Sequence, residues 1–247
     1  MKSKILKTIV LILISTGLRA QNIVGEVEYR YKIFYDKIYS SLPHLTPQER
    51  DRIQLSWGNP EGYSTRMKLQ FWPEKSLYTF GAPYEVRSYS WQVEDYFIEN
   101  NLEEQTYLKY MDQMGKTYIV RDSLNAPKWR VMNEIRDILG HMCMKAVSED
   151  TLKGQKITAW FASDIPVPVG PEEQFGLPGL ILAYDINDGM LIVEAEKITF
   201  GEPGEIITLP KKLKGREVSG TEYQDLVKDF IQTSIESKQA WMWEIRY

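Results

Sequence analysis

Cysteine and histidine are nearly absent from this chain of 247 residues, which contains one cysteine and two histidines. The single cysteine, Cys143, excludes an intramolecular disulfide, so we expect the fold to depend on its apolar core and the thiol to be buried. The sequence also lacks HExxH and Cys-x-x-Cys spacing, a Gly-x-Ser-x-Gly turn, a phosphate-binding glycine loop and a dinucleotide fingerprint. No common catalytic or nucleotide-binding motif is therefore present.

Long hydrophobic runs are missing after the first twenty residues. The first seven residues carry three lysines, residues 8–18 are almost entirely apolar, and Ala20 offers a small residue before a cut at Gln21. This apolar run is too short for a bilayer, which needs about 20 residues, so we interpret residues 1–20 as a cleaved signal peptide. An uncleaved anchor is the alternative. No cysteine lies near the cut, so we expect a periplasmic or secreted protein that is not a lipoprotein and has no transmembrane segment in its mature chain.

Positive charge is in the minority. The formal net charge is −4, and loss of the four cations in residues 1–20 brings it to −8. An acidic chain has no electrostatic footprint for nucleic acid, so we expect no nucleic-acid partner. An anionic lipid surface would also repel it weakly.

Alternation of apolar and polar residues recurs along most of the chain. It predicts half-buried strands, and their short lengths and near-regular spacing favour antiparallel pairing. Residues 112–115 suit a hairpin turn with Gly115 in the left-handed conformation. Strands are expected at residues 27–35, 63–71, 75–80, 105–110, 116–121, 128–133, 141–147, 155–162, 179–184, 190–200 and 241–247.

Two segments carry helical signals. A capping box at residues 46–49 predicts a short helix that ends near Gly58. Apolar residues at helical spacing over residues 223–235 predict an amphipathic C-terminal helix, with Thr221 and Gln224 as its capping box. After the signal peptide, we expect a single mainly β domain up to the last residue, with a curved antiparallel sheet like a half-barrel and the C-terminal helix packed on it. A closed up-and-down barrel is the alternative.

The most distinctive motif lies in residues 138–183. It contains Cys-Met-Lys-Ala at residues 143–146, Asp-Ile-Pro at 164–166, and the hexapeptide Gly-Leu-Pro-Gly-Leu-Ile at 176–181. This segment resembles the GLPGLI family, exported proteins of Bacteroidota-type bacteria that have no established biochemical activity. The resemblance implies partners such as outer-membrane transport proteins. The chain departs from the family pattern at Gln174, where members often have an aromatic residue.

The hexapeptide has no titratable side chain, so it cannot itself perform acid–base or nucleophilic chemistry. The segment Leu177-Pro178-Gly179-Leu180 fits a type II turn, with Gly179 where φ must be positive. Such a turn leads directly into a buried strand. We interpret the motif as architectural, and a ligand-facing backbone loop is the alternative.

Four neighbouring residues suggest two kinds of chemistry. His141 and Cys143 would share one face of a strand, about 7 Å apart, and a nucleophilic pair would need favourable rotamers. With Met142 and Met144 they form a set of soft ligands suited to copper(I). Alternation directs the methionines away from the cysteine, so one ion cannot easily use all four. A core strand is the favoured interpretation.

Carboxylates offer a further enzymatic alternative. Asp164, or the Glu172–Glu173 pair, could serve a glycosidase-like site, although such charges usually mark solvated loops. Tyr29, Tyr31 and Tyr35 fall on one face of the first strand, where they could line a groove for a peptide, sugar or lipid. Core packing is the more usual role of such tyrosines.

Export, the tyrosine-rich face and the lack of a catalytic constellation favour an exported cell-envelope binding or accessory protein. Its partner would be an outer-membrane or periplasmic protein, or a small apolar or peptide ligand. An envelope enzyme that uses dispersed carboxylates or the Cys143 thiol is the alternative, and a copper(I)-binding protein is a lesser one. We assign no catalytic residue, metal ligand or cofactor. The candidate binding residues are Tyr29, Tyr31, Trp160, Asp164, Gly176, Leu177, Pro178 and Gly179.

Overall fold

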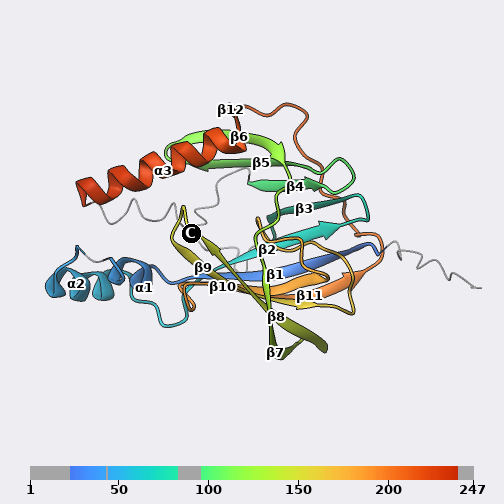
Figure 1. Cartoon of the computed structure of the whole chain (residues 1–247), viewed down its shortest axis with the longest axis horizontal. Coiled ribbons are helices and arrows are strands. Elements are labelled where there is room, and N and C mark those ends of the chain that lie inside the picture. Colours follow the sequence, from blue (N-terminus) through green and yellow to red (C-terminus); the bar gives the residue numbers. More distant parts are fainter. Residues whose placement is uncertain (1–22, 43, 83–95, 239–247) are drawn as a thin grey trace, which may run out of the picture.

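The computed structural model describes residues 23–42, 44–82 and 96–238. The expected signal peptide and the strand expected at residues 241–247 lie outside these residues. Within them the chain forms strands and helices arranged as in Figure 1. The strands are β1 (Gly25–Ile33), β2 (Tyr63–Phe71), β3 (Lys75–Phe80), β4 (Phe97–Asn101), β5 (Thr106–Gln113), β6 (Lys116–Ser123), β7 (Arg130–Ile138), β8 (His141–Asp150), β9 (Gln155–Ala162), β10 (Leu180–Ile186), β11 (Leu191–Phe200) and β12 (Arg216–Ser219). The helices are α1 (Tyr35–Ser40), α2 (Pro47–Trp57) and α3 (Gly220–Ser237).

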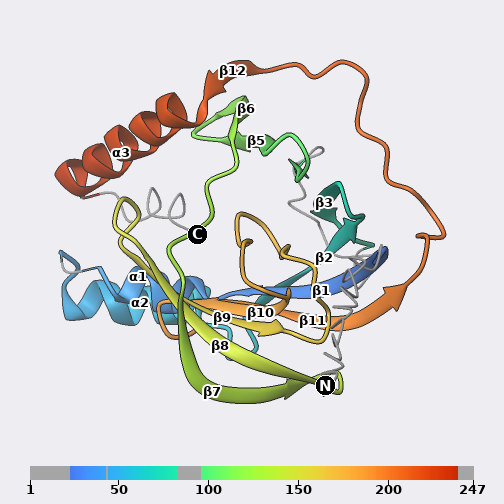
Figure 2. The ribbon, with the colours of Figure 1, turned by 45° about the vertical axis from the view of Figure 1, so that its right-hand side comes forward.

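All described strands belong to one sheet, in the order β12-β6-β5-β4-β3-β2-β1-β11-β10-β9-β8-β7. Neighbouring strands are antiparallel except β12 and β6, which run parallel. The prediction of a curved, mainly antiparallel sheet with a C-terminal helix is confirmed. A closed barrel is wrong, because β12 and β7 end the strand order without pairing to each other. Figure 2 shows the resulting half-barrel, with the loop between β9 and β10 inside its curve.

The helices follow their sequence signals closely. The capping box of α2 is confirmed. Helix α3 begins two residues earlier than expected, because the hydroxyl of Ser219 accepts a hydrogen bond from the amide of Glu222 and replaces the cap expected at Thr221. Tyr35 begins α1, whereas alternation had placed it in the first strand. Among the described residues, no helix has the length and apolar character needed to cross a membrane.

Two apolar clusters set the shape of the half-barrel. Strands β1, β2 and β8–β11 form the main core, into which the loop of residues 163–179 is packed. Helix α3 forms a second cluster with β5, β6 and β12. Leu152, at the tip of the β8–β9 hairpin, packs against this second cluster. The hairpin therefore connects the two ends of the sheet across the open side of the half-barrel (Figure 1).

The hexapeptide leads into β10 as expected, but its turn differs from the prediction. Gly179 does not have a positive φ, and its amide donates to the carbonyl of Leu177 at 2.8 Å, in a tight turn around Pro178. A Cβ on Gly179 would lie 2.2 Å from the carbonyl oxygen of Ala162. The expected type II turn is therefore wrong, and glycine is required here because the chain passes against the end of β9. The positive φ, 84°, belongs to Gly176.

Candidate functional site

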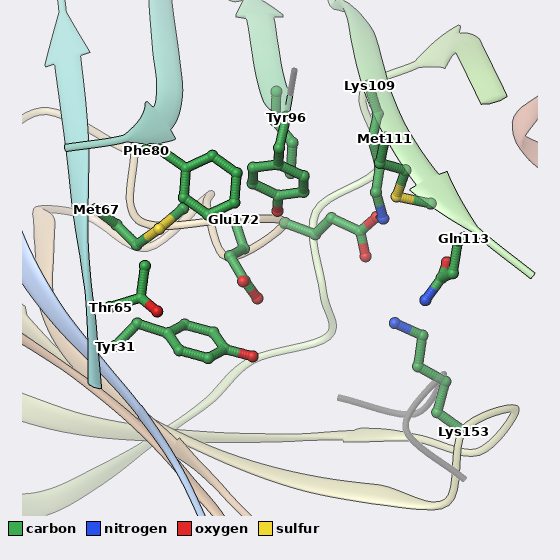
Figure 3. Close-up of a pocket in the computed structure, with 12 residues that line it drawn as sticks. Tyr31, Thr65, Met67, Phe80, Tyr96, Lys109, Met111, Gln113, Lys153 and Glu172 are labelled. Atoms are coloured by element: carbon green, nitrogen blue, oxygen red, sulfur yellow. The ribbon is translucent and has the colours of Figure 1, made fainter. Parts of the chain in front are cut away.

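A cavity of about 320 Å³ lies on the concave side of the half-barrel. Its walls come from β1–β5, from the tip of the β8–β9 hairpin and from the loop of residues 163–179 (Figure 3). The lining combines aromatic and apolar side chains with four charged ones. The lining residues are Tyr31, Thr65, Met67, Phe80, Tyr96, Ile98, Lys109, Met111, Gln113, Lys153, Glu172 and Glu173.

The pairing of β2 with β3 and of β4 with β5 brings the apolar side chains of the cavity wall together. Met67 on β2 lies opposite Phe80 on β3, and Ile98 on β4 lies opposite Lys109 on β5. Side chains that are opposite each other share one face of a sheet and contact one another. The rings of Phe80 and Tyr96 also pack together, with their centres 5.5 Å apart. The register therefore places the ammonium group of Lys109 among apolar side chains.

Lys109 forms an ion pair with Glu173, with 2.5 Å between Nζ and a carboxylate oxygen. The Lys109 side chain is 9% exposed, whereas that of Glu173 is 48% exposed. The ammonium also lies 5.4 Å from the centre of the Tyr223 ring. The Lys109 charge, with a smaller contribution from Lys153, lowers the pKa of Glu173 to about 2 against the opposing effect of burial. Glu173 is therefore ionised at neutral pH.

Glu172 occupies a different environment, among tyrosines. The hydroxyl of Tyr184 donates a 2.6 Å hydrogen bond to its carboxyl group. After burial, the charge of Glu172 is the next cause that raises the pKa values of Tyr31, Tyr78, Tyr96 and Tyr184. Burial also raises the pKa of Glu172 itself, opposed by the hydrogen bond from Tyr184 and by nearby lysines. The surroundings of Glu172 thus favour its protonated form.

The backbone at Glu172 is in the left-handed region, with φ 54°. Such a conformation costs a non-glycine residue on the order of 1–3 kcal/mol, and it persists only where the surrounding structure imposes it. Hydrogen bonds from Gln174 to Pro171, at 3.1 Å, and from Gly176 to Pro168, at 3.0 Å, close the loop around it. The loop therefore holds two adjacent carboxyl groups at the cavity at the expense of backbone strain.

This arrangement has two chemical capabilities. An aromatic wall with a few charged and hydrogen-bonding groups can hold a small molecule by its apolar body and orient its polar end. In addition, Glu172 and Glu173 have pKa values shifted in opposite directions. A carboxyl group with a raised pKa beside one with a lowered pKa is the pairing that acid–base catalysis uses.

The three tyrosines expected to share a groove are separated in the structure. Tyr31 lines the cavity. Tyr29 is fully buried and donates a 2.7 Å hydrogen bond to the carbonyl of Ile181. Tyr35 belongs to α1, where its ring centre lies 5.8 Å from that of Trp57. The prediction of one groove lined by all three is wrong, because the chain leaves the sheet before Tyr35.

Trp160 and Asp164 are also away from the cavity. Trp160 lies on the face of β9 opposite the buried core residues, beside a hollow of about 430 Å³. Arg136 and Lys145 lie over its ring, at 5.7 and 5.9 Å from the centre. Asp164 is exposed and contacts Nδ1 of His141 at 2.7 Å. The structure therefore does not bring these two candidates together with Tyr31.

Cys143 is buried, as expected. Burial raises the pKa of its thiol to about 12, which disfavours the thiolate that a nucleophile needs. Its Sγ is 3.5 Å from the carbonyl oxygen of His141, while the imidazole pairs with Asp164. Met142 is 54% exposed. In the described part of the chain, no group of three or more His, Cys, Asp or Glu side chains is placed to hold a metal ion.

Residues 176–179 do not line the cavity, but they end the loop that supplies both glutamates. The sequence analysis did not identify Lys109 as a site residue. Its side chain points to the concave side of β5 and lines the cavity. The neighbouring outward positions, Leu108 and Tyr110, are also apolar because residues 207–213 cover that face. With apolar side chains on both faces, alternation did not reveal which face Lys109 would occupy.

Comparison with known proteins adds a family segment and a fold. Residues 148–183 match the family model described as "Protein of unknown function (Porph_ging)". No curated protein matches the chain. Two solved structures of PNGF-II, in the C2 and P21 space groups, are similar to 83% of this chain, with 16% identity and TM-scores of 0.53 and 0.55. The similarity covers 32% and 33% of the PNGF-II chains, so this chain spans about a third of their length. Residues 148–183, which include the hexapeptide and both glutamates, are thus similar to a Bacteroidota-associated family of unknown function.

Proposed function

We propose that this protein binds one small amphipathic molecule in the cavity on the concave side of the half-barrel. The observation that carries the proposal is the composition of the cavity, in which a mainly apolar wall contains the Lys109–Glu173 ion pair and the Glu172 carboxyl group. Its volume of about 320 Å³ is at the lower end of the range for small-molecule sites, which is roughly 300–1,000 Å³. Binding rather than catalysis is the leading function.

The charged groups support a binding role because they are costly where they stand. Removing an ammonium group from water lowers stability unless a partner compensates it, and an apolar side chain would fill the same position without that cost. The left-handed backbone at Glu172 adds strain at the same place. The buried charges and the strained backbone both lower stability, so their presence at the cavity supports a role in binding a ligand.

Saturation-transfer NMR with the neutral probe 4-phenyl-1-butanol tests the proposal. We expect the purified protein to bind the probe, and Thr65→Trp to abolish binding, because Thr65 lines the cavity and a tryptophan would fill it. Ser64→Trp is the matched control, since Ser64 is exposed on the same strand and does not line the cavity. Probe binding that Thr65→Trp leaves intact, or no binding of the probe by the wild type, contradicts the proposal.

An acid–base enzyme is the second candidate, favoured by the opposite pKa shifts of Glu172 and Glu173. Glu172 would donate a proton and Glu173 would accept one, as in a glycosidase-like reaction. The test is hydrolysis of a panel of 4-nitrophenyl glycosides. Turnover that Glu172→Gln removes supports this candidate, and absence of turnover in the wild type eliminates it.

We also propose that the protein is exported to the cell envelope, as the N-terminal sequence and the similarity to GLPGLI proteins suggest. There it would act as a binding or accessory protein for envelope partners. The support for export is the lysine-rich start followed by the apolar run of residues 8–18. Mass spectrometry of the protein recovered from the periplasm should find a chain that begins at Gln21. A full-length chain in the membrane fraction would indicate an uncleaved anchor.

A further inference from the structure

The four charged side chains of the cavity are unequally paired. The Glu173 carboxylate pairs with Lys109, and Lys153 also acts on its pKa from a greater distance. The Glu172 carboxyl group accepts a hydrogen bond from the hydroxyl of Tyr184. Of the two lysines that line the cavity, Lys109 therefore has a carboxylate partner and Lys153 has no ion pair among the described residues.

Lys153 is held in place at the cavity although its side chain has no ion pair among the described residues. Its amide donates a 2.9 Å hydrogen bond to the carboxylate of Asp150, and Gly154 completes the turn with φ 65°. The preceding residue, Leu152, packs against the cluster formed by α3 and β5. This anchoring fixes the backbone of Lys153 beside the cavity, which its side chain lines.

A second hydrogen-bond donor points to the same place. The hydroxyl of Tyr223 donates to Oε1 of Gln113, which leaves the amide NH₂ of Gln113 available. Figure 3 shows this amide nitrogen facing the ammonium of Lys153. Two donors that converge without an acceptor between them form a site for an acceptor, and an anion is the acceptor that a lysine favours most.

The opposite part of the cavity is mainly aromatic and apolar, and the Glu172 carboxyl group and Thr65 also lie there (Figure 3). Met67, Phe80 and Tyr96 form its wall, and Tyr31 closes it from β1 (Figure 3). This wall accepts an aromatic or aliphatic group by burial of apolar surface. The two ends of the cavity thus differ in the chemistry that they recognise.

We infer that the ligand is a small amphipathic anion whose single carboxylate, or similar anionic group, binds between Lys153 and Gln113 while its apolar body lies against Met67, Phe80 and Tyr96. The inference rests on the proposed binding function and adds the chemical class and the orientation of the ligand. It names Lys153 as the residue that determines selectivity for charge.

A series of three probes that share one apolar body tests this inference. Isothermal titration of the purified protein with 4-phenylbutyrate, 4-phenyl-1-butanol and 4-phenylbutylamine separates the contribution of charge from that of the body. We expect the butyrate to bind at least about tenfold more tightly than the alcohol, because a hydrogen bond to a charged group is stronger than one between neutral groups. The amine should bind more weakly than the alcohol.

Variants of Lys153 identify the group responsible. Lys153→Gln should remove the preference for the butyrate over the alcohol, and Lys153→Glu should reverse the preference in favour of the amine. Lys156→Gln and Lys156→Glu are the matched controls, because Lys156 is an exposed lysine on the adjacent strand β9 and does not line the cavity. These controls should retain the wild-type order.

The possible failures are distinguishable. If the alcohol binds in the cavity and the butyrate binds no more tightly, the inference about the anion is wrong and the binding function stands. The same holds if the Lys156 variants lose the preference as readily as the Lys153 variants do. If none of the three probes binds, the proposed function itself is overturned.

Discussion

The two faces of the sheet carry similar charged residues in different surroundings. On the outer face, beside Trp160, Arg136 pairs with Glu194 at 2.5 Å, and their side chains are 38% and 44% exposed. On the concave face, Lys109 pairs with Glu173 at the same distance, but the lysine is only 9% exposed. Water screens the attraction between Arg136 and Glu194. The buried Lys109 ammonium is largely out of reach of water, so water cannot fully solvate it if Glu173 is removed. The loss of one partner should therefore cost more stability on the concave face than on the outer face.

The largest difference is expected in the reactivity of neighbouring sulfur atoms on β8. Cys143 belongs to the buried core and its pKa is raised to about 12, whereas Met142 is 54% exposed. Iodoacetamide should therefore alkylate Cys143 at least about a hundredfold faster in urea than in the native protein, since only the thiolate reacts. Dilute peroxide should oxidise Met142 without unfolding. Rapid native alkylation, followed by mass spectrometry, would revive the nucleophile alternative.

Removal of the acidic partner should cost more on the concave face than on the outer face. Glu173→Gln leaves the buried Lys109 ammonium uncompensated, and we expect a loss of about 1–3 kcal/mol in the free energy of unfolding at pH 7, reduced by the partial exposure of Glu173. Glu194→Gln should cost less than about 0.5 kcal/mol. Urea denaturation of both variants measures the difference, and equal losses would contradict it.

The pH dependence of the Glu173 contribution follows from its lowered pKa. Its folded-state pKa of about 2 is below the ordinary value of 4.5, so its stabilising effect is complete above pH 4.5. The effect is then lost as the pH falls toward 2. The stability difference between the wild type and Glu173→Gln should therefore shrink over this range.

Glu172→Gln should act in the opposite direction and more weakly. Because burial raises the pKa of Glu172, its ionisation lowers the stability of the folded protein as the pH rises through that pKa. Glutamine mimics the protonated form and still accepts the hydrogen bond from Tyr184. The variant should match the wild type at pH 4 and be more stable than the wild type at pH 8. Thermal unfolding at the two pH values provides the measurement, and a loss of stability at pH 8 would contradict the assigned environment.

The smallest effect is expected at Trp160. Trp160→Ala removes an aromatic side chain from the outer hollow, and it should change the affinity for 4-phenylbutyrate by less than about twofold, because no cavity residue contacts the ring through a described interaction. Titration calorimetry is the measurement. A large loss of affinity would move the binding site to the outer face.

Local signals in the sequence predicted the elements of the fold well. The bounds of β3 and β9 agree with the expected ranges, and the capping box of α2 is present. These features depend on the periodicity of apolar residues and on contacts between residues a few positions apart in the sequence. The parallel pairing of β12 with β6 was missed, because it joins segments about a hundred residues apart and has no local pattern.

The candidate site was less accessible to sequence reasoning. Glu172 and Glu173 were considered, but their opposite environments depend on Tyr184 and Lys109, which reach them through the fold. The sequence predicts that Gly179 is needed for a positive φ. In the structure it is needed because a Cβ at this position would clash with the backbone of Ala162. The motif therefore identified these residues, but their roles depend on contacts with parts of the chain that are distant in the sequence.

A crystal structure of the protein with 4-phenylbutyrate would show where the anion binds. We expect one molecule in the concave cavity, with its carboxylate at Lys153 and its ring against Phe80 and Tyr96. A probe found in the outer hollow beside Trp160, or one whose carboxylate points away from Lys153, would contradict the proposed site.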